Sequence, residues 1–171
     1  MSIRKIYQYP EQVLRQPTVP IIHCTEEVQR LIADMAETMY DAPGVGLAAP
    51  QIGESVRLIV VDVSRDREND REYMALINPE IIASEGYQLD EEGCLSVPEL
   101  TAQVKRHKKI TVSYRDMEGK PCELTTEDRF AVVLQHEIDH LNGILFIDHL
   151  SPLKRKLYKR KVKKWLATSE G

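Results

Sequence analysis

The feature that most constrains this chain is the run His136-Glu137-Ile138-Asp139-His140. Positions i and i+4 share one face of an α-helix, so on a helix both imidazoles can reach one metal ion. Glu137 would then lie beside the ion, placed to take a proton from water that the ion activates. Two histidines do not complete a metal site, so a third ligand must come from elsewhere in the chain.

The residues around this run favour a rigid, partly buried helix. Thr125 or Thr126, together with Asp128, is expected to cap its start, and Gly143 to end it. Histidines on a helix are also common as ordinary hydrogen-bonded groups, so the run alone leaves metal catalysis undecided. Apolar residues recur at helical spacing and predict a buried face made of Phe130, Val133, Leu134, Ile138 and Leu141.

The order of the other expected elements predicts an α+β fold, with antiparallel β-sheets packed around a central metal-binding helix and a C-terminal helix. At 171 residues, the chain is expected to form one domain, residues 1–171. Helices are expected at residues 26–40, capped by Thr25, and at about 151–167, starting with Ser151-Pro152; strands are expected at 56–63, 73–82 with a break near Asn78-Pro79, 110–114 and, after a turn at 116–119, 121–126.

Composition excludes several classes of protein. The first ten residues lack the apolar stretch of a signal peptide, and no apolar run approaches the length of a membrane span. The three cysteines are too few and too scattered for a disulfide framework. We therefore expect a cytoplasmic protein with reduced thiols and with neither a membrane nor DNA as a partner.

Positions downstream of the histidines are the first candidates for the third ligand. In metzincin peptidases a third histidine follows six residues after the second, and here that position is Phe146. Thermolysin-like peptidases use a glutamate some twenty or more residues on, but no glutamate lies between His140 and Glu170. Asp148 and His149 stay open as ligands, although their spacing matches no known arrangement. A zincin-type endopeptidase is therefore a disfavoured alternative.

Upstream, Cys94 is the strongest candidate. It follows Gly93, which allows close approach of the backbone, and a thiolate is a strong ligand for zinc or ferrous iron. The alternative is that Cys94 is a small buried apolar residue, which is how we interpret Cys24 and Cys122. A third notable segment, GVGLAAPQ at residues 44–51, would bring backbone close to a ligand such as a peptide, or would simply be a tight loop.

Together, these three segments resemble the peptide deformylase family. The family carries three motifs in order, G-φ-G-φ-A-A-x-Q, E-G-C-φ-S and Q-H-E-x-D-H, where φ is apolar. They stand complete here at residues 44–51, 92–96 and 135–140, and the match extends into the flanking stretches over nearly the whole chain. The resemblance implies an enzyme that removes the formyl group from the N-terminal formyl-methionine of nascent polypeptides and releases formate.

The resemblance also implies the composition of the metal site. Cys94, His136 and His140 would bind one divalent metal ion, in agreement with Cys94 as the strongest candidate on the residues alone. Ferrous iron is favoured, because a thiolate leaves less positive charge on the metal than a third histidine would; zinc and nickel are the alternatives.

Catalytic roles follow from the same resemblance. Glu137 would act as the general base and then as the general acid. The backbone N–H of Leu95 and the side-chain amide of Gln51 would donate hydrogen bonds to the developing oxyanion.

The expected substrate pocket lies one helical turn before the histidines, where Val132 and Val133 share faces with His136 and Glu137. Many relatives have an apolar residue where Arg129 stands, so its stem is expected along the pocket with its head in solvent. Arg106 matches a family arginine near the peptide site, or is a solvated surface charge. The residues expected to contact substrate are Val45, Gly46, Gly93, Arg106, Arg129, Val132 and Val133.

Charge is distributed unevenly along the chain. Residues 151–171 carry eight Lys or Arg and one Glu, and since the net charge is −4, the remainder carries −11. Apolar residues Leu153, Leu157, Val162, Trp165 and Leu166 are expected to dock this helix on the body. The basic residues are then either a solvated face or, as the resemblance suggests, a contact with ribosomal RNA near the exit of the nascent chain. A non-catalytic ribosome-binding protein is the second alternative, but it leaves residues 136–140 unexplained.

Overall fold

The computed structural model of the protein describes residues 2–170, without the side chains of residues 169 and 170. The α-helices are α1 (Glu26–Asp41), α2 (Asp128–Leu141) and α3 (Pro152–Glu170), and short 3-10 helices are η1 (Gln12–Arg15), η2 (Ala49–Ile52) and η3 (Phe146–His149). The strands are β1 (Gly46–Ala48), β2 (Leu58–Asp62), β3 (Tyr73–Glu85), β4 (Gln88–Cys94), β5 (Val97–Arg106), β6 (Lys109–Arg115) and β7 (Pro121–Glu127).

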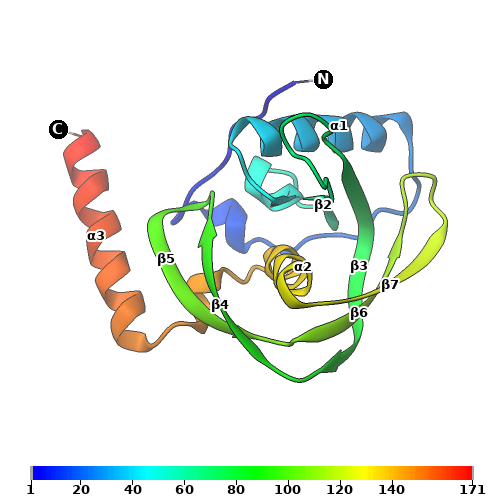
Figure 1. The fold of residues 1–171 in the computed structure, drawn as a ribbon. Helices are drawn as coiled ribbons and strands as arrows, with labels where there is room; N and C mark the ends of the chain where they lie inside the picture. Colours follow the sequence, from blue (N-terminus) through cyan, green and yellow to red (C-terminus); the bar gives the residue numbers. More distant parts are fainter. Residues whose placement is uncertain (1, 171) are drawn as a thin grey trace.

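The strands form two antiparallel sheets around α2 (Figure 1). One sheet has the order β1-β2-β3-β6-β7, and the other is the hairpin of β4 and β5. Helix α1 covers the large sheet on one side, and α3 lies at the edge of the molecule beyond β5 (Figure 1). The predicted α+β class, with antiparallel sheets around a central helix and a helix at the C-terminus, is confirmed.

Strand β2 shows how the sequence builds the core. Successive side chains of a strand point to opposite faces. Leu58 and Val60 pack in the same cluster as Met35 of α1, whereas Ile59 and Val61 pack in the cluster that α2 completes. Both faces of β2 are buried, which explains its unbroken run of apolar residues. Helix α2 is therefore fixed against a sheet that α1 supports from behind.

Several predicted boundaries are correct. Helix α1 begins after Thr25, whose hydroxyl accepts a hydrogen bond from the Val28 N–H at 3.3 Å. The expected break at Asn78 is a bulge inside a continuous β3. Asn78 has a φ of 52°, and its side-chain amide makes two hydrogen bonds of 2.8 Å with the backbone of Ile21.

The predicted caps of α2 are partly wrong. Thr125 and Thr126 lie within β7, and the residue before the helix, Glu127, makes no side-chain capping bond. Strand β7 runs directly into α2, with Asp128 at a φ of 60°, so a separate capping turn does not form. Gly143 does end the helix as expected, with a φ of 71°.

Two segments near the site have more regular structure than the sequence predicted. Residues 44–51 contribute β1 and η2, and the hairpin of β4 and β5 was not predicted. Strand β4 has the sequence QLDEEGC, whose many acidic residues hide its alternating burial. This hairpin carries Cys94 to the centre of the molecule.

Helix α3 begins as predicted, because the Ser151 hydroxyl accepts a hydrogen bond from the Lys154 N–H at 3.3 Å. It extends to Glu170, beyond the expected end at about 167. The predicted docking stripe is only partly correct, since Leu153 and Leu157 are 67% and 52% exposed. Tyr158 is buried instead and, with Val162 and Trp165, packs in the cluster that contains Leu14, Val97 and Phe146.

All three described α-helices contain charged residues. Within residues 2–170, none of them combines the length and the apolar character needed to cross a bilayer.

Candidate metal centre

Helix α2 supplies two histidines and a glutamate to the interior of the molecule. His136, Glu137 and His140 are all buried, at 8%, 5% and 1% exposure. Their surroundings are set by the packing of α2 on the large sheet, where Leu134 and Ile138 fill the opposite side of the helix. The predicted helix therefore presents both imidazoles on one face, as the i and i+4 spacing requires.

Cys94, at the end of β4, completes a three-residue cluster. Its Sγ atom lies 3.4 Å from Nε2 of His140, and the ligand atoms of Cys94, His136 and His140 all lie within 4.8 Å of one another. In a tetrahedral site with metal–ligand bonds of about 2.0–2.3 Å, donor atoms stand roughly 3.3–3.8 Å apart. The three side chains therefore fit a metal ion with small adjustments.

The two downstream candidates are held elsewhere. Asp148 forms an ion pair with Arg15 at 2.6 Å, and His149 lies 2.9 Å from Oδ2 of Asp139. Among the described residues, the only cluster of three or more metal-ligating side chains is that of Cys94, His136 and His140.

The electrostatics of the cluster also favour a cation. Burial lowers the pKa of His136, but the neighbouring thiol of Cys94 and the carboxylates of Glu137 and Glu92 outweigh it and raise that pKa well above its usual value. Burial and the charges of His136 and Arg106 lower the pKa of His140. A site that attracts a proton so strongly at one imidazole is suited to a metal cation in its place.

Glu92 orients the first histidine. Its Oε1 atom accepts a hydrogen bond from Nδ1 of His136 at 2.8 Å, which leaves Nε2 of His136 available to a metal. Arg106 grips the same carboxylate, donating from Nε and Nη2 at 2.8 Å each. Burial alone would raise the pKa of Glu92, but Arg106 and His136 lower it to about 2.

The predicted position of Arg106, near the peptide site or on the surface, is wrong. Its side chain is 4% exposed and does not line the pocket; it is neither a peptide contact nor a solvated surface charge. Besides Glu92, it donates from Nη1 to Asp139 at 2.5 Å. Two carboxylates from β4 and α2 thus pull the guanidinium into the interior, where it supports His136 through Glu92.

Glu137 lies against Gly46 of β1. A Cβ atom on Gly46 would stand 2.6 Å from Oε2 of Glu137, so the glycine makes room for this carboxylate. Oε1 of Glu137 has no hydrogen-bond partner among the described residues. Burial raises the pKa of Glu137 to about 7, which is suitable for a group that takes and returns protons near neutral pH.

Gln51, from η2, faces the same centre. Its Nε2 donates to Ser96 Oγ at 3.0 Å and lies 3.6 Å from the sulfur of Cys94. Its carbonyl oxygen accepts from the Ala48 N–H at 2.9 Å, which fixes the amide orientation. Leu95 follows Cys94 directly and lines the pocket beside it.

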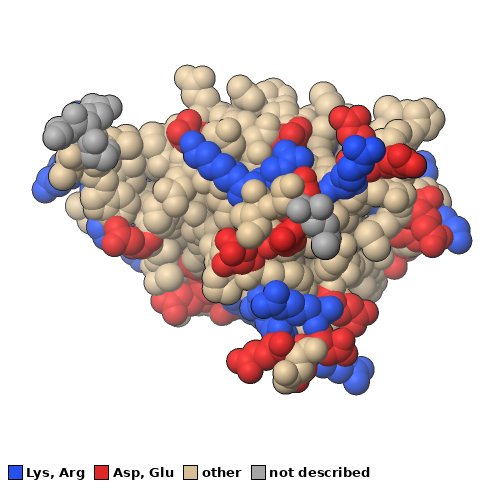
Figure 2. Space-filling model, turned by 90° about the horizontal axis from the view of Figure 1, so that it is seen from above, with Lys and Arg blue, Asp and Glu red and all other residues tan. Residues whose placement is uncertain are grey.

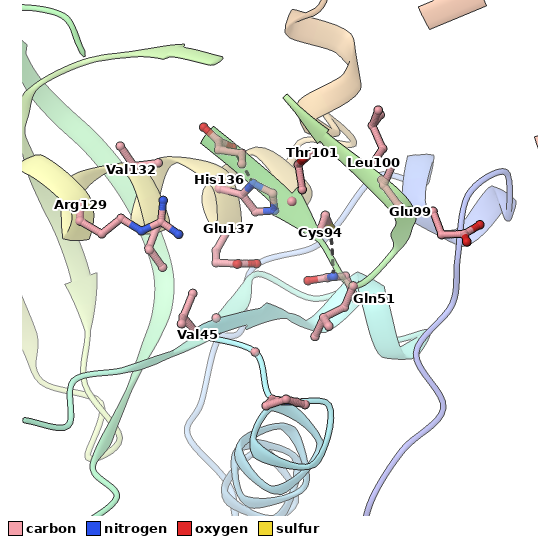
Figure 3. Close-up of a pocket in the computed structure, with 18 residues that line it drawn as sticks. Val45, Gln51, Cys94, Glu99, Leu100, Thr101, Arg129, Val132, His136 and Glu137 are labelled. Atoms are coloured by element: carbon pink, nitrogen blue, oxygen red, sulfur yellow. Dashed lines mark hydrogen bonds and ion pairs between the residues drawn. The ribbon is translucent and has the colours of Figure 1, made fainter. Parts of the chain in front are cut away.

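A pocket of about 450 Å³ opens onto the cluster. Figure 3 shows Cys94, His136 and Glu137 turned toward this pocket, with Gln51 near Cys94. Six of the seven residues expected to contact substrate line it, all but Arg106: Val45, Gly46, Gly93, Arg129, Val132 and Val133. Val45, Val132 and Val133 form an apolar part of its lining, the valine wall.

Three residues that hold this centre were not predicted from the sequence. Glu92 stands in the E-G-C-φ-S motif, two residues before Cys94, so it lies on the same side of the strand as the thiol. Ser96 stands in the same motif and holds Gln51. Asp139 is inside the run 136–140 and binds Arg106. Their positions in the motifs were the available signal, but their partners could be identified only from the folded structure.

Comparisons with known proteins agree with the motifs. Residues 3–156 match the family model described as polypeptide deformylase. The chain is 65% identical over 165 residues to a peptide deformylase from Desulfotalea psychrophila, covering 96% of this chain and 98% of that one. A crystal structure of a peptide deformylase from Legionella pneumophila superposes with a TM-score of 0.89 at 50% identity, covering 99% and 98% of the two chains. A peptide deformylase from Ehrlichia chaffeensis in complex with actinonin gives 0.89 at 36% identity, covering 96% and 98%.

Proposed function

The chain belongs to the polypeptide deformylase family, metal-dependent enzymes that remove the N-terminal formyl group of nascent peptides, and from this premise we propose how its residues perform that reaction. Cys94, His136 and His140 would hold one divalent metal ion. The observation that carries this proposal is the convergence of their donor atoms within 4.8 Å beside a buried carboxylate, Glu137.

The metal ion and Glu137 would have different roles in the reaction. When bound, a divalent cation supplies Lewis-acid chemistry, which makes water nucleophilic near neutral pH and polarises a carbonyl group. Glu137 takes the proton of the attacking water at its carboxylate and returns it to the nitrogen of the departing amine. Its closeness to Gly46 supports this role, because the carboxylate is confined to one place on the pocket wall.

Gln51 and Leu95 stabilise negative charge as the formyl carbon becomes tetrahedral. The Gln51 amide lies beside Cys94 and is held by Ser96 and Ala48, so it needs little reorganisation during the reaction. One such donor is typically worth about 3 kcal/mol. The backbone N–H of Leu95 is the second donor. Because Leu95 directly follows Cys94, this N–H would lie next to the same oxygen.

The methionine side chain of the substrate would lie along the valine wall. This surface begins one helical turn from His136 and Glu137 and is apolar, as an unbranched thioether chain requires. Gly46 and Gly93 leave the backbone accessible on either side of the reacting group. The substrates are formyl-methionyl nascent chains, which are made in the cytoplasm, so we place the enzyme there.

Ferrous iron is the ion that we propose for the site, with zinc and nickel as alternatives. A thiolate and two imidazoles suit all three ions, and the thiolate reduces the net positive charge of the centre. Formate release by the protein loaded with each ion in turn, under anaerobic conditions, decides among the three ions.

We further propose that α3 associates with the ribosome near the exit of the nascent chain. Seven of its eight basic residues are exposed, while Tyr158 and Val162 dock the helix on the body. By contrast, the face of the molecule that α1 covers has basic and acidic side chains interspersed (Figure 2). A helix with eight basic residues and a single acidic one, at its last position, is suited to the phosphates of RNA.

The deciding experiment measures formate release from a formyl-Met tripeptide under anaerobic conditions. We expect activity that is lost on chelation and restored by added Fe²⁺, with Zn²⁺ and Ni²⁺ tested in parallel. An unformylated peptide with internal bonds serves as the control for endopeptidase activity. Formate release that survives complete metal removal, or cleavage of internal bonds alone, would overturn the proposal.

A further inference from the structure

Arg129 brings a charged group to the pocket, at the end of the valine wall that is farther from His136 along α2. It lies on the first turn of α2, and Figure 3 shows its guanidinium on the same side of the pocket as Val45. Its Nη1 atom donates to Asp90 Oδ2 at 2.8 Å and to the Glu91 carbonyl at 3.3 Å, both on β4. The arginine therefore bridges α2 and β4 at this end of the pocket.

Asp90 keeps the guanidinium in place. Its second oxygen, Oδ1, accepts a hydrogen bond from the Glu91 N–H at 2.9 Å, so the carboxylate is oriented before it meets the arginine. A nearby bond also joins the two elements, because Nε2 of Gln88 donates to the Asp128 carbonyl at 3.0 Å. Although the Arg129 side chain is 60% exposed, these contacts fix where its charge lies.

The spacing along α2 places Arg129 where the tip of a methionine side chain would end. Arg129 precedes His136 and Glu137 by seven and eight residues, which is about 10.5–12 Å along the helix axis. An extended methionine reaches roughly 7 Å from the formyl carbon to its terminal methyl, with bonds of about 1.5 Å. A hydrogen bond adds about 3 Å. The guanidinium is thus within reach of the substituents on the sulfur, if the formyl group lies at the metal cluster.

We infer that Arg129, held by Asp90, is a specificity-determining residue that lets the enzyme accept N-formyl-methionine sulfoxide at the N-terminus of its substrates. This inference rests on the proposed function and on the methionine pocket described above. A sulfoxide oxygen is a strong hydrogen-bond acceptor, and in a wall of valines alone its burial would be unfavourable. The N–H groups of Arg129 that Asp90 does not occupy supply the missing donor. Asp90 acts as a positioning residue.

The test compares three tripeptides that differ only in the first side chain: formyl-Met, formyl-Met sulfoxide and formyl-norleucine. Norleucine has the length of methionine without a polar atom. We expect Arg129→Leu to lower the ratio of kcat/KM for the sulfoxide over methionine by about tenfold, because a charge-assisted hydrogen bond at a partly exposed site is lost. The ratio for norleucine over methionine should not fall.

Asp90→Ala is the second variant, since it leaves the arginine in place but removes its anchor. We expect a fall of about threefold in the sulfoxide ratio. Arg30→Leu is the matched control, because Arg30 is an exposed arginine on α1 that is paired with Glu26. An equal sulfoxide ratio in the wild type and both pocket variants would overturn the inference. Absence of formate release from formyl-Met by every form of the protein would instead overturn the proposed function.

Discussion

Nδ1 of His136 lies 2.8 Å from Oε1 of Glu92, and this bond connects helix α2 to a hairpin more than forty residues earlier in the chain. Glu92 itself accepts hydrogen bonds from Nε and Nη2 of Arg106, and Nη1 of the same arginine donates to Asp139 of the helix. The two histidines of α2 are thus supported by different means. His136 is oriented by a buried charge network, whereas His140 is fixed mainly by packing, with no bond at its Nδ1 among the described residues.

Glu92→Gln should weaken metal binding by about 10- to 100-fold, because the hydrogen bond that orients His136 loses its charge. Competition against a chelator of known affinity, followed by metal analysis, measures the change. Glu91→Gln is the control, since that carboxylate is exposed and one residue away. Equal metal affinity in the two variants would show that Glu92 does not support the site.

The pH dependence of stability should also reveal Glu92. Burial opposes its ionisation, but Arg106 and His136 lower its pKa to about 2 in the folded protein. A carboxylate with a lowered pKa stabilises the fold above the unfolded-state pKa of about 4.5, and this stability is lost as the pH falls toward 2. The shift corresponds to about 3 kcal/mol. Chemical unfolding of the metal-free protein between pH 5 and 3 should show a steeper loss for the wild type than for Glu92→Gln; parallel curves would contradict the assignment.

Glu137→Ala should retain its metal and lose nearly all turnover, by roughly 10³-fold, because no other described group is placed to carry the proton. Its carboxylate is buried with one oxygen unpaired, so its removal should not destabilise the fold. The measurements are kcat on a formyl-Met peptide, metal content and thermal stability. Retained turnover with full metal content would remove Glu137 from the mechanism.

Gly46→Ala should disable the same carboxylate by displacement. The added methyl group would stand 2.6 Å from Oε2 and 2.9 Å from Cγ of Glu137, which requires the side chain to move. We expect kcat to fall by about 10²-fold while the metal is kept. Gly93→Ala is an informative comparison, because its methyl group would meet the Thr101 side chain at an ordinary 3.4 Å. An unaffected kcat in Gly46→Ala would show that Glu137 adapts.

The parts of the site that the sequence predicts are those with a local pattern. The period of α2 places His136 and His140 on one face, and Cys94 follows from elimination and from its motif. The hairpin that carries Cys94 could not be predicted in the same way. Three of the seven residues of its strand β4 are acidic, and its pairing with β5 depends on the three-dimensional surroundings rather than on an apolar alternation.

The burial of Arg106 could not be predicted from the sequence either. Its neighbours in the chain, Lys105 and His107, suggest a basic surface segment. Its partners Glu92 and Asp139 are 14 and 33 residues away, and only the packed structure reveals that both lie beside it. Burial of a charge depends on such distant partners, so a single sequence gives no direct signal for it.

Charge reversal on α3 should test ribosome binding without damage to the fold. Truncation before the helix would remove the buried Tyr158 and Val162, whereas Lys156, Arg160 and Lys163 are exposed on the opposite side. Changing these three to Glu should weaken ribosome binding at low salt by more than tenfold and reduce its salt dependence, since phosphate contacts are lost. Binding is measured by sedimentation with ribosomes over a range of salt concentrations.

The same charge change at three exposed lysines of the body provides the control, at Lys108, Lys109 and Lys120. These residues lie around β6 and the turn before β7, elements that are on the other side of the molecule from α3 (Figure 1), so the control protein has the same net charge but an intact basic helix. If both triple variants lose ribosome affinity equally, overall charge rather than α3 governs the association. If only the α3 variant loses it, while formate release from a free tripeptide stays equal in both, the helix serves to localise the enzyme and not to catalyse.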